Sequence, residues 1–270
     1  MPKVVIGSDD LPMTEVGAWT VEKHKRLEKY VDISRYVRRR FAQTETTYIE
    51  LFCGPGRSII EGTPDIIDGS AILAGQTAKS GGYPYTDVHL ADADERFVQA
   101  ACKRMPQGVG RIHPHVGDAE NTVDDVVRHL NKHGLHFAFL DPYALDPLSF
   151  SILDKLAAFK RMDMLIHVSI QDFQRNLRRY MEEGLTLERF APGWRKVINP
   201  DDNDRNIRIA IFNHWLGLIQ KLDMAASQGI EKVVGSNRQP LYWLVFVARH
   251  RQAHKFWNEI KNIGDQRELF

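Results

Sequence analysis

Acidic side chains recur where short apolar segments of this chain end. Glu50 lies within the first such segment, and Asp92, Asp118 and Asp141 directly follow three later ones. In a parallel sheet the carboxyl ends of the strands meet at one edge, where ligands bind. Carboxylates at that edge can accept hydrogen bonds from the hydroxyl, amino or ammonium groups of a ligand. The spacing therefore predicts one binding site assembled from several strand ends.

A Gly-Pro-Gly turn over residues 54–56 closes the first apolar segment. A dinucleotide fingerprint would need a third glycine where Ile59 stands, and a P-loop would need a lysine where Arg57 follows the turn. Both fingerprints therefore fail. Residues without a side chain still let the carboxylate and ribose of a ligand approach the backbone. The alternative is that the turn does no more than end a strand.

The segment around this turn resembles the first motif of class I S-adenosylmethionine-dependent methyltransferases, in the F-x-G-x-G form. Phe52, Cys53, Gly54 and Gly56 carry the resemblance. It implies that S-adenosyl-L-methionine is the cofactor and that these residues approach it. It also implies that Glu50 faces the methionine ammonium through a hydrogen bond or a water molecule.

The acids after the second and third strands suit the rest of such a cofactor. Asp92 can accept hydrogen bonds from both ribose hydroxyls, as acids do in nucleotide-binding sheets. Asp94, two residues later, is the weaker candidate because Asp is a favoured N-cap residue. Asp118 suits an adenine amino group. Its alternative role is to cap the helix expected over residues 122–132.

The fourth strand end presents Asp141, Pro142 and Tyr143 after the apolar segment 136–140. The element resembles the D/N-P-P-Y/F motif of amino-group methyltransferases, but the second proline is absent. The resemblance implies that Asp141 and a backbone carbonyl accept hydrogen bonds from the target amine, while Tyr143 stacks on the base. As an alternative, Asp-Pro after a strand is a common turn starter.

The order of elements predicts the fold that positions these residues. Strands alternating with helices indicate a parallel sheet covered on both faces. We expect a Rossmann-like α/β fold of the class I methyltransferase type, with a mostly parallel seven-stranded sheet, an antiparallel terminal hairpin and a helical insertion. Strands are expected at 47–53, 87–91, 113–116, 136–140, 164–169, 230–236 and 241–248. Helices are expected at 20–41, 70–80 (after a long loop), 93–105, 122–132, 148–159 and 254–263, with the insertion at about 171–228. Residues 1–270 would form a single domain.

Composition bounds the function classes. The 270 residues carry 36 basic and 35 acidic side chains, a net charge of +1 that indicates neither nucleic acid nor a membrane surface as a partner of the whole chain. The two cysteines suit a reducing, cytoplasmic compartment. The apolar patch at the N-terminus is too short for a signal peptide, and no apolar run approaches the roughly 20 residues of a membrane helix.

Local charge and histidine patterns are less specific. The basic clusters 23–26, 38–40 and 175–179 could contact the phosphates of a nucleic-acid substrate, although each one alone is typical of a solvated helix surface. His113 with His115, and His129 with His133, have ligand-like spacing. The arrangement lacks the glutamate of a helical zinc motif, so no metal is assigned. His167 is expected to be a satisfied core histidine.

Taken in order, these segments resemble one family, the three-Cys-motif partner proteins (TcmP). The matching stretches are K-H-K-R-L at 23–27, F-C-G-P-G at 52–56, D-G-S-A-I at 68–72, L-A-D at 90–92, F-L-D-P-Y at 139–143 and Y-W-L-V-F at 242–246. The resemblance implies a methyltransferase-like fold and a partner protein of the radical S-adenosylmethionine type with three cysteines. It leaves two hypotheses: a methyltransferase acting on an amine nitrogen of a nucleic-acid base, or a cofactor-binding, non-catalytic partner subunit.

Overall fold

The computed structural model describes residues 3–227, 231–234 and 240–265, with strands and helices alternating as predicted. The central sheet has the strand order β10-β12-β9-β8-β3-β6-β7. From β9 to β7 all neighbours are parallel, whereas β12 runs antiparallel to β9. The bounds are β3 Thr46–Glu50, β6 Asp87–Asp92, β7 Arg111–Val116, β8 Leu135–Leu140, β9 Met162–Ser169, β10 Ala225–Ala226, β11 Glu231–Val234 and β12 Pro240–Ala248. The predicted Rossmann-like α/β fold, with a mostly parallel sheet between helices, is confirmed.

The terminal hairpin is also confirmed. Both β10 and β11 pair antiparallel with β12, β10 opposite its last residues and β11 opposite its first half. The two short strands therefore act as one interrupted strand beside β12. With that strand counted once, the sheet has the seven positions that the sequence predicts.

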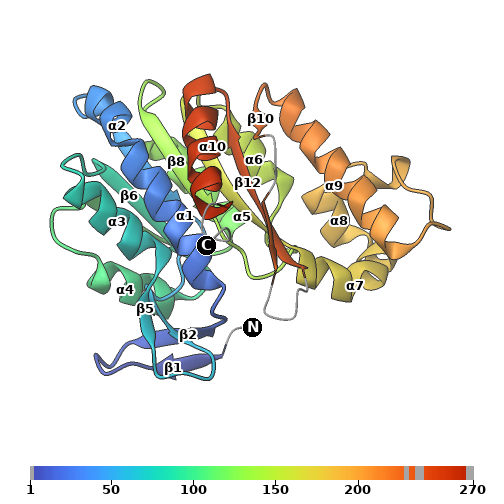
Figure 1. Ribbon diagram of the computed structural model, residues 1–270, viewed down its shortest axis with the longest axis horizontal. Coiled ribbons are helices and arrows are strands. Elements are labelled where there is room, and N and C mark those ends of the chain that lie inside the picture. Colours follow the sequence, from blue (N-terminus) through green and yellow to red (C-terminus); the bar gives the residue numbers. More distant parts are fainter. Residues whose placement is uncertain (1–2, 228–230, 235–239, 266–270) are drawn as a thin grey trace.

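Side chains alternate between the two faces along every buried strand, and apolar side chains lie on both faces. Helices therefore cover both faces of the sheet. Helices α1 Thr20–Ile33, α3 Ser70–Ser80, α4 Glu95–Arg104 and α10 Arg251–Asp265 pack on what we term the first face. The second face is covered by α5 Ala119–His129, α6 Phe150–Ala157, α7 Ile170–Glu183, α8 Leu185–Phe190 and α9 Asp204–Lys221. Figure 1 shows α1 and α10 side by side in front of the sheet, with α8 and α9 at its right.

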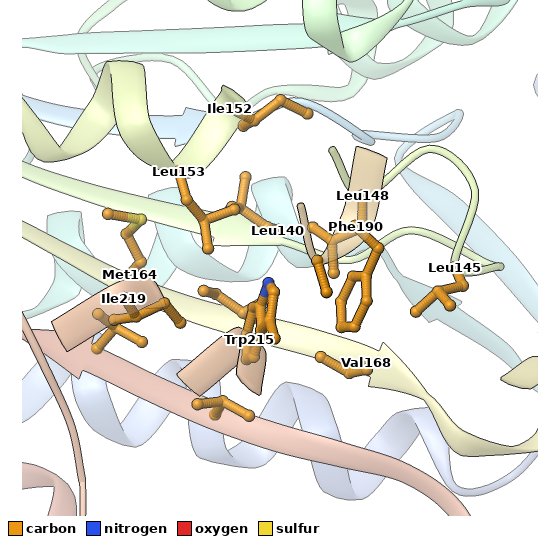
Figure 2. Packing of buried hydrophobic residues seen from close by; sticks show 14 of the residues in the cluster. Leu140, Leu145, Leu148, Ile152, Leu153, Met164, Val168, Phe190, Trp215 and Ile219 are labelled. Atoms are coloured by element: carbon orange, nitrogen blue, oxygen red, sulfur yellow. The ribbon is translucent and has the colours of Figure 1, made fainter. Parts of the chain in front are cut away.

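The helices α7 to α9 occupy most of the predicted insertion, which enlarges the core on the second face. Trp215 of α9 is fully buried and stacks on Phe190 of α8 with ring centroids 5.2 Å apart. Figure 2 shows Trp215 among side chains of β8, β9 and α6. Burial of this large apolar surface fixes the insertion helices against the strands that carry the site. Within the described ranges, no helix combines the length and apolar content that crossing a bilayer requires.

The opening helix is divided at Ser34, where a single helix over 20–41 was expected. Helix α1 ends at Ile33 and α2 spans Arg35–Phe41. The Ser34 hydroxyl donates to the carbonyls of Tyr30 and Val31, so it competes with the helical backbone bonds. Arg38 of α2 is buried, whereas Arg39 and Arg40 of the same helix are exposed.

A second, small sheet replaces the long loop expected after the glycine turn. Strands β4 Arg57–Ile60 and β5 Ile66–Asp68 form a hairpin, and β4 pairs in parallel with β2 Pro12–Val16. Strand β1 Val4–Ile6 completes the order β1-β2-β4-β5, seen at the bottom of Figure 1. The expectation of a loop was wrong because the strand pairing joins segments more than 40 residues apart, which local pattern does not reveal.

Candidate functional site

The glycine turn after β3 has a backbone that only glycine adopts easily. Gly54 and Gly56 have φ angles of 56° and 80°. A Cβ on Gly56 would lie 3.1 Å from the Cα of Ala101, so α4 packs directly against the turn. A Cβ on Gly54 would instead have no atom within 4 Å, so this residue faces open space. The turn thus combines a packed side with an open side along which a ligand can approach the backbone.

Asp92, at the end of β6, fixes that open side. Its Oδ2 accepts a hydrogen bond from the Gly54 amide at 3.0 Å and its Oδ1 accepts one from the Asp94 amide at 3.1 Å. Burial raises the pKa of Asp92, although these amides and others oppose the shift. Each oxygen keeps a lone pair for a further donor. The expected alternative for Asp94 is confirmed, because its carboxylate accepts from the Arg96 amide and caps α4.

Asp118 follows β7 and stands at the N-cap position of α5. This is the position expected if Asp118 capped the helix, yet its side chain makes no capping hydrogen bond. The residue is exposed. Its carboxylate is therefore open to a ligand on the same edge of the sheet as Asp92, since β6 and β7 are parallel neighbours.

Glu50 is fully buried, in contrast to the two aspartates. Ser70, at the start of α3, donates its hydroxyl to Oε1, and the Tyr48 hydroxyl donates to Oε2 at 2.7 Å. Burial raises the pKa of Glu50 to about 8, so at neutral pH the carboxyl is mostly protonated. As placed, Glu50 joins β3 to α3. Its contact with a methionine ammonium stays a prediction.

Phe52 and Cys53 line the turn from inside. Phe52 is partly buried against the core of the second face, and Cys53 is 4% exposed in the core of the first. Burial raises the pKa of the Cys53 thiol, so it stays protonated, with its Sγ donating to the Gly54 carbonyl at 3.3 Å. These two residues shape the loop, and the Cys53 thiol is enclosed in the core.

Asp141, at the end of β8, is held in an ion pair that crosses from the sheet to α1. Lys23 Nζ lies 2.6 Å from Oδ1 and 2.5 Å from Oδ2. Both side chains are largely buried, at 9% exposure for Lys23 and 17% for Asp141. Burial acts to raise the pKa of Asp141, but Lys23, together with His167 and His24, opposes it and the pKa is lowered. The ion pair with Lys23 therefore holds Asp141 in place as a carboxylate that accepts hydrogen bonds.

His167 and Tyr242 complete the surroundings of this ion pair. His167 Nδ1 lies 3.4 Å from Asp141 Oδ1 and 3.0 Å from the Pro142 carbonyl oxygen, and its ring packs on Tyr242 at 4.5 Å. Burial, with a smaller contribution from Lys23, lowers the pKa of His167 to about 4, so the imidazole is neutral. The interpretation of His167 as a satisfied interior histidine fits this placement.

The D-P-Y element itself is split between interior and surface. Pro142 is buried, whereas Tyr143 is 61% exposed. An exposed aromatic ring at the edge of the site is available for stacking. The Asp141 carboxylate, in contrast, is paired with Lys23 of the same chain.

Lys23, Ser70 and His167 were not predicted as site residues. A signal for Lys23 existed in the K-H-K-R-L stretch, but it was interpreted as solvated surface. Spacing places Lys23 on the same side of α1 as Leu27 and Tyr30, which are both buried. This apolar stripe was the observation that could have assigned Lys23 to the interior.

The predicted histidine pairs are rearranged. His133 lies beyond the end of α5 at His129, so those two do not share a helix. Instead His89 of β6 and His113 and His115 of β7 gather beside His129, the last residue of α5, and His89 Nδ1 lies 2.9 Å from His115 Nε2. Across the residues that are described, no group of three or more candidate ligands is arranged for a metal ion.

The basic clusters have different surroundings from one another. Arg38 is interior at 1% exposure. Arg178 and Arg179 lie on the outer side of α7, paired with Asp204 and Glu183. Arg38 is therefore not part of a basic surface, and Arg178 and Arg179 have acidic neighbours.

Comparisons with known proteins reach only distant structural likeness. No protein-family model matches the sequence, and a search of curated proteins finds no match. The protein LPL1258 from Legionella pneumophila strain Philadelphia 1, of the DUF519 family model, is 9% identical over 86% of this chain and 89% of its own, with a TM-score of 0.48. Cofactor-bound Rv0187 from MTB is 13% identical over 87% and 82%, with a TM-score of 0.43. The plantazolicin methyltransferase BpumL in complex with SAH is 10% identical over 86% and 87%, with a TM-score of 0.38. The fold assignment rests on the strand order described above.

Proposed function

We propose that this chain binds S-adenosyl-L-methionine across the carboxyl ends of β3, β6 and β7 and is a methyltransferase. The observation that carries the proposal is the Gly54 turn, whose open side is fixed by the Asp92 carboxylate. The amides and lone pairs there suit a ligand carboxylate and ribose. Asp118 supplies a further open carboxylate for an adenine amino group.

The acceptor in this proposal is an amine nitrogen of a nucleic-acid base. The nitrogen lone pair would form the new N–C bond as the C–S bond breaks, and the amine proton would pass to solvent. Asp141 would accept a hydrogen bond from the amine and Tyr143 would stack on the base. Because Lys23 keeps Asp141 ionised, its role is orientation.

The second candidate is a cofactor-binding partner subunit of a radical S-adenosylmethionine protein with three cysteines, as the TcmP resemblance implies. The Lys23–Asp141 ion pair favours it, because the carboxylate that should meet the amine is engaged within the chain. A fold alone does not establish which candidate is correct.

Cofactor binding is tested by calorimetry with Gly54→Val and Gly62→Val. Both glycines have positive φ angles and open space at the Cβ position, so the backbone strain is matched. Only Gly54 lies in the proposed cofactor turn. We expect Gly54→Val to abolish measurable binding and Gly62→Val to leave the affinity unchanged. Equal changes of cofactor affinity in the two variants would contradict the proposed cofactor position.

Methyl transfer is tested by a tritium-methyl assay on DNA, RNA and protein. The variant is Tyr143→Ala, and its control is Tyr36→Ala, because the two tyrosines are similarly exposed at 61% and 58%. We expect Tyr143→Ala to reduce transfer at least tenfold without changing cofactor affinity. Cofactor binding with no transfer to any acceptor would favour the partner subunit.

A further inference from the structure

A cavity of about 680 Å³ lies at the edge of the sheet opposite the proposed cofactor site. It opens beside the first residues of β8 and β9, between α1, α2 and the start of α10. Figure 1 shows α2 and one end of α10 at the top of the molecule. The volume falls in the range of about 300 to 1,000 Å³ found for small-molecule sites. The proposed methyltransferase function makes no use of it.

The cavity contains a buried guanidinium with an unsatisfied donor. Arg38 donates through Nε to the Tyr83 carbonyl at 3.0 Å and through Nη1 to the Val31 carbonyl at 2.5 Å. Its Nη2 is buried and has no hydrogen-bond partner in the described part of the chain. The same group stacks on the Tyr85 ring at 4.9 Å. Because an unpaired buried donor is costly, an acceptor atom of a ligand would stabilise this arrangement.

A carboxylate lines the same cavity. Asp163 Oδ2 accepts a hydrogen bond from the Tyr30 hydroxyl at 2.6 Å. No other hydrogen bond to this carboxylate is formed by the residues that the structure describes. Asp163 lies on the first face of the sheet, where α1 and α2 also pack. The cavity therefore offers an acceptor and a donor from two separate elements.

The walls and the rim differ in character. Phe41 and Phe256, both partly buried, contribute aromatic surface, and Tyr85 and Phe137 lie behind them in the core. Basic side chains, which include exposed Arg40, Lys160 and Arg161, lie at the rim. Aromatic walls suit a planar ring, and a cationic rim suits an anionic group attached to that ring.

We propose that this cavity binds a mononucleotide. The base would lie between the aromatic side chains with its hydrogen-bonding edge toward Arg38 and Asp163, because a Watson–Crick edge places an acceptor beside a donor. The 5′-phosphate would lie at the rim, near Arg40 and Lys160. This site is separate from the proposed cofactor position on the other edge of the sheet.

The test is calorimetric titration of the full chain with GMP, AMP and UMP, with the matching nucleosides, and with inorganic phosphate. We expect at least one nucleotide to bind at least tenfold more tightly than its nucleoside or than phosphate. The double substitution Arg40→Ala with Lys160→Ala should remove that difference and leave nucleoside affinity unchanged. Lys196→Ala, at an exposed lysine on another part of the surface, serves as the control.

The proposed contacts of the base inside the cavity are tested with two variants. Asp163→Asn keeps an oxygen that accepts from the Tyr30 hydroxyl, and Phe256→Ala removes an aromatic ring. Each should weaken nucleotide and nucleoside binding at least fivefold while the thermal melt stays cooperative. The titrations are repeated in Gly54→Val, which alters only the proposed cofactor turn, so failure of the proposed function leaves this test intact.

Three results would overturn the nucleotide site. The first is no nucleotide binding at millimolar concentration. The second is phosphate binding as tightly as the nucleotides. The third is nucleotide binding that is lost in Gly54→Val and unchanged in Asp163→Asn, which would place the nucleotide at the carboxyl ends of the strands.

Discussion

On the first face of the sheet, Asp141 lies at the carboxyl end of β8 and Asp163 lies near the amino end of β9, and both side chains are partly buried. Helix α1 supplies a partner to both. Lys23 pairs with Asp141, and Tyr30, two turns later on the same side of α1, donates to Asp163. The pKa of Asp141 is lowered, since Lys23 with the nearby His167 and His24 together outweigh burial. Burial raises the pKa of Asp163 to about 6, because a neutral hydroxyl opposes it only weakly.

The polar groups at the two ends of the strands differ in whether they are paired within the chain. At the carboxyl end the charges of Lys23 and Asp141 neutralise each other within the chain. At the amino end Arg38 Nη2 has no hydrogen-bond partner in the described part of the chain, and Asp163, which lines the same cavity, accepts from the Tyr30 hydroxyl. The ion pair between Lys23 and Asp141 stabilises the fold, whereas an unpaired donor and a carboxylate that both line a cavity are suited to a ligand.

The largest expected effect is a loss of stability when the ion pair at the carboxyl end is broken. Lys23→Met leaves the buried Asp141 carboxylate without its cation and should lower the free energy of unfolding by about 3 kcal/mol. Lys25→Met, on the exposed side of the same helix, should change it by less than about 0.5 kcal/mol. Urea denaturation of both variants measures the difference. Equal midpoints would mean that the ion pair does not stabilise the carboxyl end.

The next effect is a pH dependence at the carboxyl end. Because the pKa of Glu50 is raised to about 8 by burial, its proton is held more tightly in the folded than in the unfolded state. Stability should therefore fall as pH rises through 8, by about 2 kcal/mol between pH 6 and 8. Glu50→Gln should remove most of that slope in urea denaturation curves. A slope that persists in the variant would assign it to another group.

A smaller effect is expected at the amino end from Tyr30→Phe. Loss of the hydroxyl removes a hydrogen bond to Asp163 and should cost about 1.5 kcal/mol at pH 7.5, where the carboxylate is ionised. At pH 5, below the pKa of about 6, the carboxyl is mostly protonated and the cost should be smaller. Tyr36→Phe, on an exposed ring, is the control. The same cost at both pH values would contradict the assigned pKa direction.

The smallest effect is expected at the rim of the amino-end cavity. Arg40 and Lys160 are exposed, so Arg40→Ala and Lys160→Ala should each change the free energy of unfolding by less than about 0.5 kcal/mol. Thermal melts without ligand measure this. A larger loss would show that the rim stabilises the fold, and the nucleotide titrations of these variants would then need reinterpretation.

Much of the fold was predictable because its signals are local. The apolar runs at Asp87–Asp92, Leu135–Leu140 and Met162–Ser169 indicate buried strands, and the bounds of α3 at Ser70–Ser80 were predicted to the residue. The order of alternation then fixed the parallel sheet. The small sheet around Arg57–Ile60 was missed, because its pairing with Pro12–Val16 depends on distant residues.

The sequence by itself determined which acids stand at strand ends, since the period of a strand and the turn that follows it are written in consecutive residues. Gly54, Asp92 and Asp118 lie where that pattern predicted. Only the tertiary structure decided which charges meet: that Lys23 turns inward to Asp141, and that Glu50 is enclosed by Ser70 and Tyr48. The physical reason is that burial and opposite charge act between elements far apart in the chain, and those terms set whether a carboxylate is an open ligand group or an interior one.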